Sequence, residues 1–465
     1  MSAMMKRVCL ALPLLALGAC VVGPDHVAPD PVLPAAYSAP ASPLPVSGGL
    51  WWQGFEDAAL DGLIGEALSG NIDLAVARER LVEANALVEA EAAGLRPSVG
   101  AELDASGTSV ISGSGNAGTG ASAGLVFGFV PDLFGGQRRR IERAEAQRDA
   151  VAFDETDIRR TTVATIAERY IDWQRSRARL ELLDTSLALQ QQTLDIVERR
   201  AEAGLSADLD VQRAAADLAT TRAQKGNLDI ALASARHDLA ILTGQAPTGF
   251  AALDDVPVLL PDFRGGPASG VPVDLVRQRA DLRAAERDLA AASAGIGVAE
   301  ADLYPALSIP GRLTGDIGAA DRIVDDVVAQ LGIALSLSLA DGGERRANVR
   351  AAEARARQAA LVYQGVLLDA LGEVETALVT IDAIEAQSIE LQTAVTASEQ
   401  AFDQLNALYR EGLASFIDIL DAQRTLISSR QSQLESRANH AKAIIGLYRA
   451  LGAQVSPATD PASPT

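Results

Sequence analysis

The sequence predicts an α+β fold in which a long α-helical hairpin and a group of β-strands occur twice along the chain. A repeat is the first observation behind this prediction, because features such as Pro97 and Pro305 recur 208 residues apart (305 − 97). Two proline-free segments, 137–203 and 344–411, are the second, and their apolar residues follow the heptad spacing of coiled coils. Short stretches of alternating apolar and polar residues are the third, and they predict strands.

The N-terminal residues 1–19 are typical of a secretion signal, because two basic residues precede an apolar run too short to span a bilayer. The sequence LGAC at 17–20 resembles a bacterial lipobox, so we expect cleavage before Cys20 and covalent lipid, including palmitate, on this residue. An ordinary signal that contains a cysteine is the alternative. Because no Asp follows Cys20, the lipid is expected to anchor the chain at the outer membrane. Residues 20–50 are rich in proline and predict an extended tether.

Each copy of the repeat is predicted to form one unit of the fold. Residues 51–260 make the first copy and residues 261–452 the second, and a disordered tail follows at 453–465. Gly204 and Gly412 mark the predicted hairpin tips and again lie 208 residues apart (412 − 204). Glycine tolerates the left-handed conformation that commonly ends a helix. We therefore expect each long helix to turn back at its glycine.

Four stretches are predicted as strands, near residues 99–105, 123–129, 307–313 and 331–339. In each, one face is apolar and the other is small or polar, which fits either a half-buried soluble sheet or a membrane barrel with apolar residues outside. Their length of about ten residues is enough to cross a bilayer when tilted, and it favours the barrel. The glycine-rich stretch 113–124 is predicted to be an external loop, because it lacks the sequence of a phosphate-binding loop.

Four membrane strands cannot close a barrel alone, because about eight are the practical minimum and lipid does not tolerate an open sheet edge. Several chains must therefore pool their strands if the sheet lies in a membrane. Three chains would supply about twelve strands and about twelve long helices (3 × 4). The fold expected on this basis is a trimeric 12-stranded β-barrel of transmembrane strands, continued by an α-helical tunnel about 100 Å long.

The composition argues against several classes of function. The chain of 465 residues has a formal net charge of −21, which disfavours nucleic acid as a partner. Its three histidines do not cluster with other metal ligands, so we expect no metal site and no cofactor apart from the lipid on Cys20. No nucleophile stands beside a general base at a recognisable spacing. The chain is therefore not predicted to be an enzyme, and no catalytic residue is assigned.

A series of short motifs covers nearly the whole chain after the signal. They are LGAC at 17–20, GPD at 23–25, WWQGF at 51–55, PDLFG at 131–135, VDLVRQRADL at 273–282, IGVAEA at 296–301, DGG at 341–343, ILDAQR at 419–424 and LYRALG at 447–452. In this order they resemble the outer membrane factors of the TolC family, specifically the lipid-anchored NodT/OprM-like channels of RND-type efflux systems.

The resemblance implies an outer membrane channel of a tripartite efflux system. Such a channel is a passive duct through which drugs or other small molecules leave the cell, and its helical part lies in the periplasm. The implied partners are two further copies of the chain, a periplasmic adaptor (membrane fusion) protein, an inner-membrane RND-type pump and outer membrane lipid.

The resemblance also implies that the hairpin tips form the periplasmic end of the tunnel. Asp418, Asp421 and Arg424 match the family's positions at the constriction, and Ile417 matches a neighbouring apolar position. Carboxylates crowded in a ring repel one another, hold protons more strongly and attract cations. The alternative is that the two acids only stabilise the first turn of a helix, where the helix dipole favours negative charge.

Two other functions are compatible with the same residues. The chain could be the outer membrane conduit of a type I-like secretion system. It could also be a lipid-anchored periplasmic coiled-coil adaptor or scaffold with a soluble sheet. The strands would lie in the membrane in either channel and outside it in the scaffold, so their location distinguishes the scaffold from the two channels.

Overall fold

The computed structural model describes residues 21–30, 37, 50–109, 111–112, 118–264, 279–317 and 327–453. The predicted signal sequence, the lipid site at Cys20, most of the tether and the tail beyond residue 453 lie outside these residues. The chain divides into two compact units. Unit 1 contains residues 1–31, 79–154 and 283–366, and unit 2 contains residues 32–78, 155–282 and 367–465.

Three helices and one strand of the first copy each have a counterpart of equal length in the second copy. The pairs are α4 (Gly136–Glu202) and α7 (Glu344–Arg410) with 67 residues, α5 (Asp208–Leu242) and α8 (Phe416–Ala450) with 35, α3 (Ile72–Ala93) and α6 (Ala280–Ala301) with 22, and β1 (Ser98–Thr108) and β3 (Ala306–Asp316) with 11. The members of each pair begin 208 residues apart (344 − 136 for the long helices). The repeat spacing found in the sequence is therefore also the spacing of the folded elements. The domain boundaries at 260/261 and 452/453 stay predictions.

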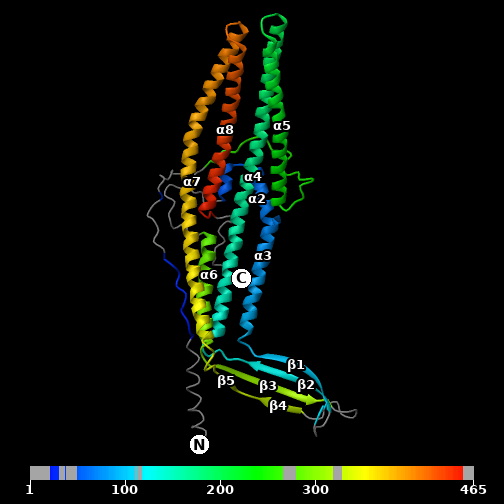
Figure 1. Ribbon diagram of the computed structural model, residues 1–465, viewed down its shortest axis with the longest axis vertical. Coiled ribbons are helices and arrows are strands. Elements are labelled where there is room, and N and C mark those ends of the chain that lie inside the picture. The colour runs from blue at the N-terminus through cyan, green and yellow to red at the C-terminus, as the bar shows by residue number, and fades with distance from the viewer. Residues whose placement is uncertain are drawn as a thin grey trace. The chain divides into compact units, whose positions relative to one another are not determined.

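The two proline-free segments are continuous helices, and each turns into a shorter antiparallel helix (Figure 1). α4 leads into α5 through the turn at Gly204, and α7 leads into α8 through the turn at Gly412. The heptad residues of α4 serve the packing, because Leu183, Leu194 and Val197 are buried. Over the described ranges, no helix has the length and apolar character needed to cross a bilayer.

The core of unit 2 forms around two short helices, the 3-10 helix η2 (Trp51–Phe55) and α2 (Ala58–Gly70). Trp51 and Trp52 are buried, and the Trp51 ring stacks on Tyr448 of α8 with 5.4 Å between the ring centroids. Asp57 caps α2 by accepting hydrogen bonds from two backbone N–H groups, and it also accepts one from the Tyr170 hydroxyl at 2.7 Å. Burial and this carboxylate raise the pKa of Tyr170.

Unit 1 contains an antiparallel sheet in the order β1-β2-β3-β4, in which a short β5 also pairs with β3. β2 spans Gly118–Phe129, β4 spans Val327–Leu331 and β5 spans Ala334–Ser336. β1 and β2 come from the first copy of the repeat and β3 to β5 from the second, so the β2–β3 pairing joins the copies. Over the described residues β1 and β4 are edge strands.

Two of the predicted strand limits were wrong. The fourth strand, predicted as 331–339, is instead β4 and β5, which share one register on β3 but are separated opposite Pro310. Proline has no N–H to give to the ladder, and only the Gly332 N–H bonds to the Pro310 carbonyl, at 2.9 Å. The glycine-rich stretch predicted as a loop is partly strand, because β2 begins at Gly118.

The register places all odd-numbered strand residues on one face of the sheet and all even-numbered residues on the other. The odd face is apolar and exposed: Val99, Leu103 and Leu331 have 69%, 74% and 78% of their surface accessible. An exposed apolar face of this extent requires lipid or another protein as its partner.

Candidate functional site

Both hairpin tips are tight turns built on glycine. Gly204 has φ of 72° and Gly412 has φ of 79°, in the left-handed region that a Cβ disfavours. In each, the residue after the glycine donates its N–H five residues back, Leu205 to Arg200 at 2.7 Å and Leu413 to Leu408 at 2.8 Å. This is the hydrogen-bond pattern of a Schellman cap, which satisfies the last carbonyls of the helix.

The second tip begins α8 with a capping box. The Ser415 hydroxyl accepts a hydrogen bond from the Asp418 N–H, and the Asp418 carboxylate accepts one from the Ser415 N–H at 3.1 Å. The Ser415 hydroxyl also donates to this carboxylate, and these bonds hold the pKa of Asp418 below its ordinary value. Within one chain, Asp418 therefore acts as a charged helix cap. The raised pKa expected for a ring of acids has the opposite sign and would arise between chains.

The four residues predicted at the constriction lie together. Ile417, Asp418, Asp421 and Arg424 line one shallow cavity of about 400 Å³ on α8, which is completed by α7. Ile417 is half exposed although it is apolar. The first-turn explanation fits Asp418, which caps α8, but not Asp421, which lies beyond the first turn.

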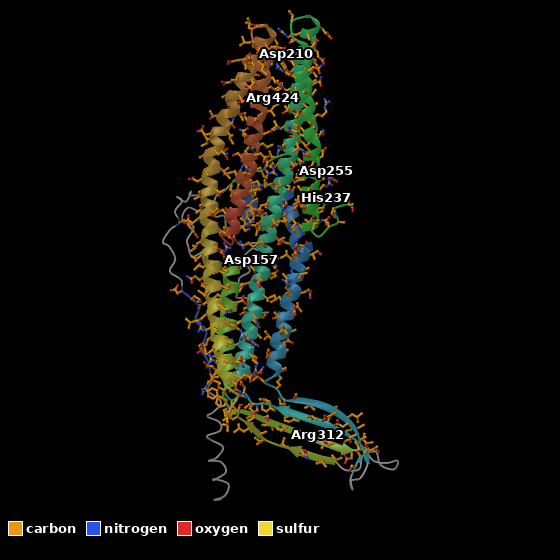
Figure 2. The ribbon with its side chains drawn as sticks, viewed as in Figure 1. Asp157, Asp210, His237, Asp255, Arg312 and Arg424 are labelled. Carbon is orange, nitrogen blue, oxygen red and sulfur yellow. The ribbon has the colours of Figure 1, made fainter. Side chains whose placement is uncertain are left out.

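Arg424, which is labelled in Figure 2, forms a polar bond between the two hairpins near the tip. Its Nε and Nη2 atoms lie 2.8 and 2.7 Å from Oδ1 of Asp217 on α5, and Gln190 on α4 donates to the other carboxylate oxygen at 2.8 Å. The Asp217 side chain is 11% exposed. Asp217 gives no signal in the sequence, because its counterpart in the second copy is Thr425 and the repeat does not single it out.

A second bond between hairpins lies closer to the turn. Arg200 on α4 donates to the backbone carbonyl of Tyr409 at 3.0 Å, and its guanidinium carbon lies 4.8 Å from the centre of the Tyr409 ring. The arginine thereby covers the C-terminal end of α7, where a cation is favoured. Buried apolar residues of α4, α5, α7 and α8, among them Phe416 and Ile419, form a hydrophobic cluster near the tips.

Some buried polar atoms along this seam find no hydrogen-bond partner among the described residues. They are Gln190 Oε1, Arg200 Nε, Tyr409 Oη and Gln423 Nε2. A buried polar group without a partner destabilises its arrangement by about 1–3 kcal/mol. These four atoms are sites where water or another chain can supply a partner.

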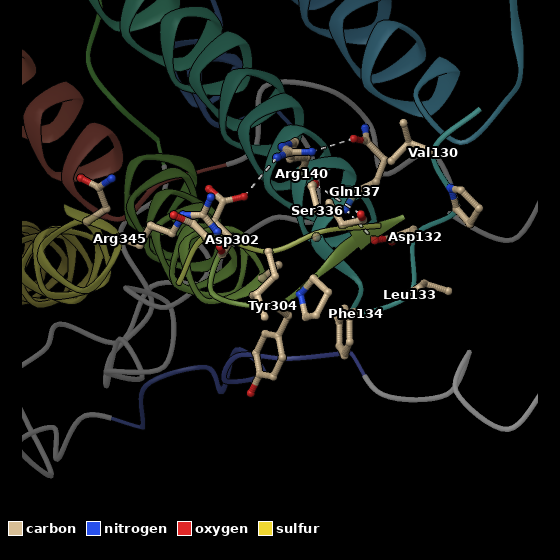
Figure 3. Close-up of a pocket in the computed structure, with 18 of the residues that line it drawn as sticks. Val130, Asp132, Leu133, Phe134, Gln137, Arg140, Asp302, Tyr304, Ser336 and Arg345 are labelled. Carbon is tan, nitrogen blue, oxygen red and sulfur yellow. Dashed lines mark hydrogen bonds and ion pairs between the residues drawn. The ribbon is translucent and has the colours of Figure 1, made fainter. Parts of the chain in front are cut away.

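Unit 1 holds a larger cavity of about 940 Å³ where the strands meet the helices (Figure 3). Two of its carboxylates already serve the fold: Asp132 caps α4 by accepting from the N–H groups of Gln137 and Arg138, and Asp341 accepts from the N–H of Gly343. Tyr304 stacks on Phe134 at 4.7 Å. No group of three His, Cys, Asp or Glu residues placed to hold a metal occurs among the described residues.

The segment that directly follows Cys20 is clamped onto unit 1. Arg139, whose side chain is 4% exposed, donates to the carbonyls of Val22 and Gly23 at 3.0 and 2.9 Å and pairs with Asp25 at 2.9 Å. Gly23 packs against Gly297 of α6 so closely that a Cβ would lie 2.3 Å from its Cα. The extended tether predicted for residues 20–50 is thus bound tightly over its first residues, as the GPD motif at 23–25 alone did not reveal.

The fold and the tips define a class of protein: a tandem repeat of long helical hairpins attached to a sheet with one exposed apolar face. The sequence model of the outer membrane efflux protein family matches residues 63–245 and 271–453, one match in each copy. The chain belongs to this family, and it is an outer membrane efflux protein.

Curated relatives and solved structures agree with the family. Nodulation protein T of Rhizobium leguminosarum bv. viciae is 33% identical over 433 residues, which cover 90% of this chain and 88% of the relative. The pyoverdine export outer membrane protein OpmQ of Pseudomonas putida is 30% identical, with coverage of 86% and 87%. The solved outer-membrane channel OprN superposes with a TM-score of 0.85 at 32% identity, covering 93% of this chain and 99% of that one.

Proposed function

We propose that three copies of the chain form the outer membrane channel of a tripartite efflux system, a passive duct for drugs or other small molecules. The strands of the three copies close one 12-stranded β-barrel, and their long helices form the α-helical tunnel in the periplasm. A periplasmic adaptor protein and an inner-membrane RND-type pump deliver the cargo. The chain performs no covalent chemistry in this role.

One observation carries the proposal: the sheet has two edge strands and an exposed apolar face. Backbone groups at a sheet edge must be hydrogen-bonded inside a bilayer, so a lone sheet of this kind cannot reside there. Pairing β1 of one copy with β4 and β5 of the next satisfies both edges. If β4 and β5 count as one interrupted strand, each chain contributes four strands, and three chains supply about twelve, enough to close a barrel.

The helices support the same assembly. α4 and α7 have 67 residues each, and an α-helix of that length rises about 100 Å. Their small apolar residues suit close lateral packing, since Ala146 of α4 is buried against Ala290 and Ala291 of α6. Long helices packed side by side from three chains would enclose a tunnel rather than a solid bundle.

The aperture of the duct is assigned to the second tip. Asp418, Asp421, Arg424 and Ile417 would be brought to the axis once in each chain, so the acids would form a ring that attracts cations. The bond from Arg424 to Asp217 ties the second hairpin to the first and holds the aperture closed. The unsatisfied polar atoms of the same seam favour its opening when an adaptor binds.

The lipid on Cys20 is proposed as a second attachment to the outer membrane. The clamp by Arg139 begins two residues after Cys20, so the lipid would be held close to unit 1, which carries the sheet. Extraction of membranes with carbonate or urea tests the scaffold alternative. A Cys20→Ala channel would stay in the membrane through its sheet, whereas a scaffold would be released.

The names of the relatives differ in cargo, and they include pyoverdine export, toluene efflux and cation efflux proteins. All of these cargoes are small, which supports a duct for small molecules. Single-channel recording in planar bilayers tests the proposed function. The full-length protein is expected to conduct in discrete steps and to prefer cations. Protein that inserts but never conducts, even after Arg424→Ala, would refute the channel.

A further inference from the structure

The even face of the sheet carries mostly small side chains, apart from one group of charged and amide side chains. Small or apolar residues occupy most even positions of the described strands: Ser98, Gly100, Ser106, Gly120, Ser122, Gly124, Val126, Gly128, Ala306, Ser308, Pro310, Thr314, Val328, Ala334 and Ser336. The exceptions are Glu102 and Asp104 on β1, Arg312 and Asp316 on β3, and Gln330 on β4.

The register gathers these five residues at one level of the sheet. Arg312 lies opposite Gln330, and Asp316 shares a transverse row with Asp104 through Ser122 of β2. Glu102 lies in the row between them, through Gly124. The five side chains thus fall in three adjacent rows and form a band across the sheet, which we call the charged band.

Arg312, which is labelled on the sheet in Figure 2, connects the band from β3 to β1, across β2. Its Nη2 atom lies 2.8 Å from Oε2 of Glu102 and 3.3 Å from Oδ2 of Asp104. The intervening strand offers no obstacle, because Gly124 has no side chain at this level. A Cβ on Gly124 would lie 2.8 Å from the Leu313 carbonyl oxygen, so this position disfavours any larger residue.

The band carries more negative than positive charge. Three carboxylates, from Glu102, Asp104 and Asp316, accompany the single guanidinium of Arg312. The side chains of the ion-paired members are about half exposed, at 46%, 56% and 43% for Glu102, Asp104 and Arg312. Their charges therefore act on ions in the adjoining solvent as well as on one another.

We propose that the charged band is a second selectivity element of the channel, which favours cations over anions and is separate from the tip aperture. The inference rests on the proposed function, because only a closed barrel turns the even face into the wall of a lumen. Three chains would repeat the band around that lumen. The lumen of a twelve-stranded barrel is wider than that of an eight-stranded barrel, which side chains fill, and narrower than that of a sixteen-stranded porin. Charges on its wall therefore lie within about one Debye length, roughly 10 Å at 0.1 M salt, of a passing ion.

Arg312 sets the strength of this selectivity. While it is present it compensates part of the negative charge of Glu102 and Asp104. Removing it leaves the acids uncompensated and increases the attraction for cations. Removing Glu102 and Asp104 leaves Arg312 with Asp316 alone, so the band loses its net negative charge. A salt bridge that only stabilises the sheet predicts no such opposite changes.

The test is the reversal potential of the full-length channel in planar bilayers under a KCl gradient. Arg312→Gln is expected to raise the ratio of potassium to chloride permeability by roughly two-fold, and the Glu102→Gln/Asp104→Asn pair, which removes two charges, is expected to lower it by roughly four-fold. Asp316→Asn is a milder variant that should lower it less. Arg430→Gln removes the same charge from α8 in unit 2 and should leave the ratio unchanged.

The outcomes separate this inference from the proposed function. If the band variants conduct with the wild-type permeability ratio, the charged band has no selective role while the channel stands. If Arg312→Gln and the double variant shift the ratio in the same direction, the assignment is likewise wrong. If no form conducts, the proposed function falls, and this inference falls with it.

Discussion

Replacing Arg424 by alanine is expected to open the channel. The guanidinium bonds to one oxygen of Asp217 through two nitrogens at 2.8 and 2.7 Å, and this bond joins α8 of one hairpin to α5 of the other. Arg424 itself is 57% exposed, which places the pair near the upper end of exposed ion pairs, at about 1 kcal/mol. Asp217 keeps its hydrogen bond from Gln190 after the change but loses its counter-ion, which can only add to this figure.

The effect is multiplied if the three chains of the proposed trimer open together. A loss of about 1 kcal/mol in each chain sums to roughly 3 kcal/mol, and since 1.4 kcal/mol is a factor of ten, the ratio of open to closed channels rises by about 10². The assay is the open probability of single channels in planar bilayers. Independent movement of the hairpins would give a rise of only about five-fold, so the size of the effect also reports how the tips move.

Arg430→Ala is the matched control, because Arg430 is on the same helix but pairs with Glu399 of its own hairpin at 2.7 Å. It removes an arginine and an ion pair without cutting a link between hairpins, so its open probability should equal that of the wild type. Equal open probabilities for Arg424→Ala and Arg430→Ala would refute the reasoning. A rise in both variants would point to loss of positive charge as the cause.

Three further predictions concern the tip and the N-terminal clamp. Gly412→Ala should lower stability by about 1 kcal/mol, seen as a lower melting temperature, because φ of 79° is strained for alanine. Arg139→Lys should release residues 21–30 to added protease, since one ammonium cannot hold two carbonyls and Asp25. Asp418, whose folded-state pKa lies below the ordinary 3.8, stabilises the tip above pH 3.8 and loses this effect as the pH falls through the lowered value. Ser415→Ala should move that loss to higher pH, which a fluorophore at the tip can follow.

Matched variants sharpen two of these predictions. Gly226→Ala, in the middle of α5 where a new Cβ meets nothing within 4 Å, should be neutral or stabilising. Arg148→Lys, on the same helix as Arg139 but paired among the described residues only with its neighbour Asp149, should leave protease resistance unchanged. A destabilised Gly226→Ala, or equal cleavage of both lysine variants, would contradict the explanation. A pH midpoint that does not move in Ser415→Ala would contradict the capping box as the cause.

The sequence predicted the features that depend on local pattern. Heptad spacing and the lack of proline are sufficient for the long helices, and glycine is sufficient for the turns at Gly204 and Gly412. The repeat could be found because the spacing of 208 residues survives in elements of equal length. Ser415 and Asp418 are three residues apart, so their capping box is also a local signal.

Features that depend on which strands or helices become neighbours could not be predicted in the same way. The break between β4 and β5 follows from Pro310 on β3, which matters only once the register is known. The start of β2 at Gly118 was missed because a strand of glycine, serine and alanine has little intrinsic β-propensity. Asp217 lies 207 residues from Arg424 in sequence, and neither the repeat nor the helix period connects them.

The most direct test of the central claim is whether the two faces of β1 meet lipid and water as a channel wall requires. A bimane fluorophore is attached to Leu103→Cys or, as the neighbouring control, to Asp104→Cys in membranes that contain the full-length protein. We predict that brominated lipid quenches the probe at 103 and aqueous iodide quenches the probe at 104. Failure of brominated lipid to quench at position 103 would contradict the channel and favour a sheet outside the membrane.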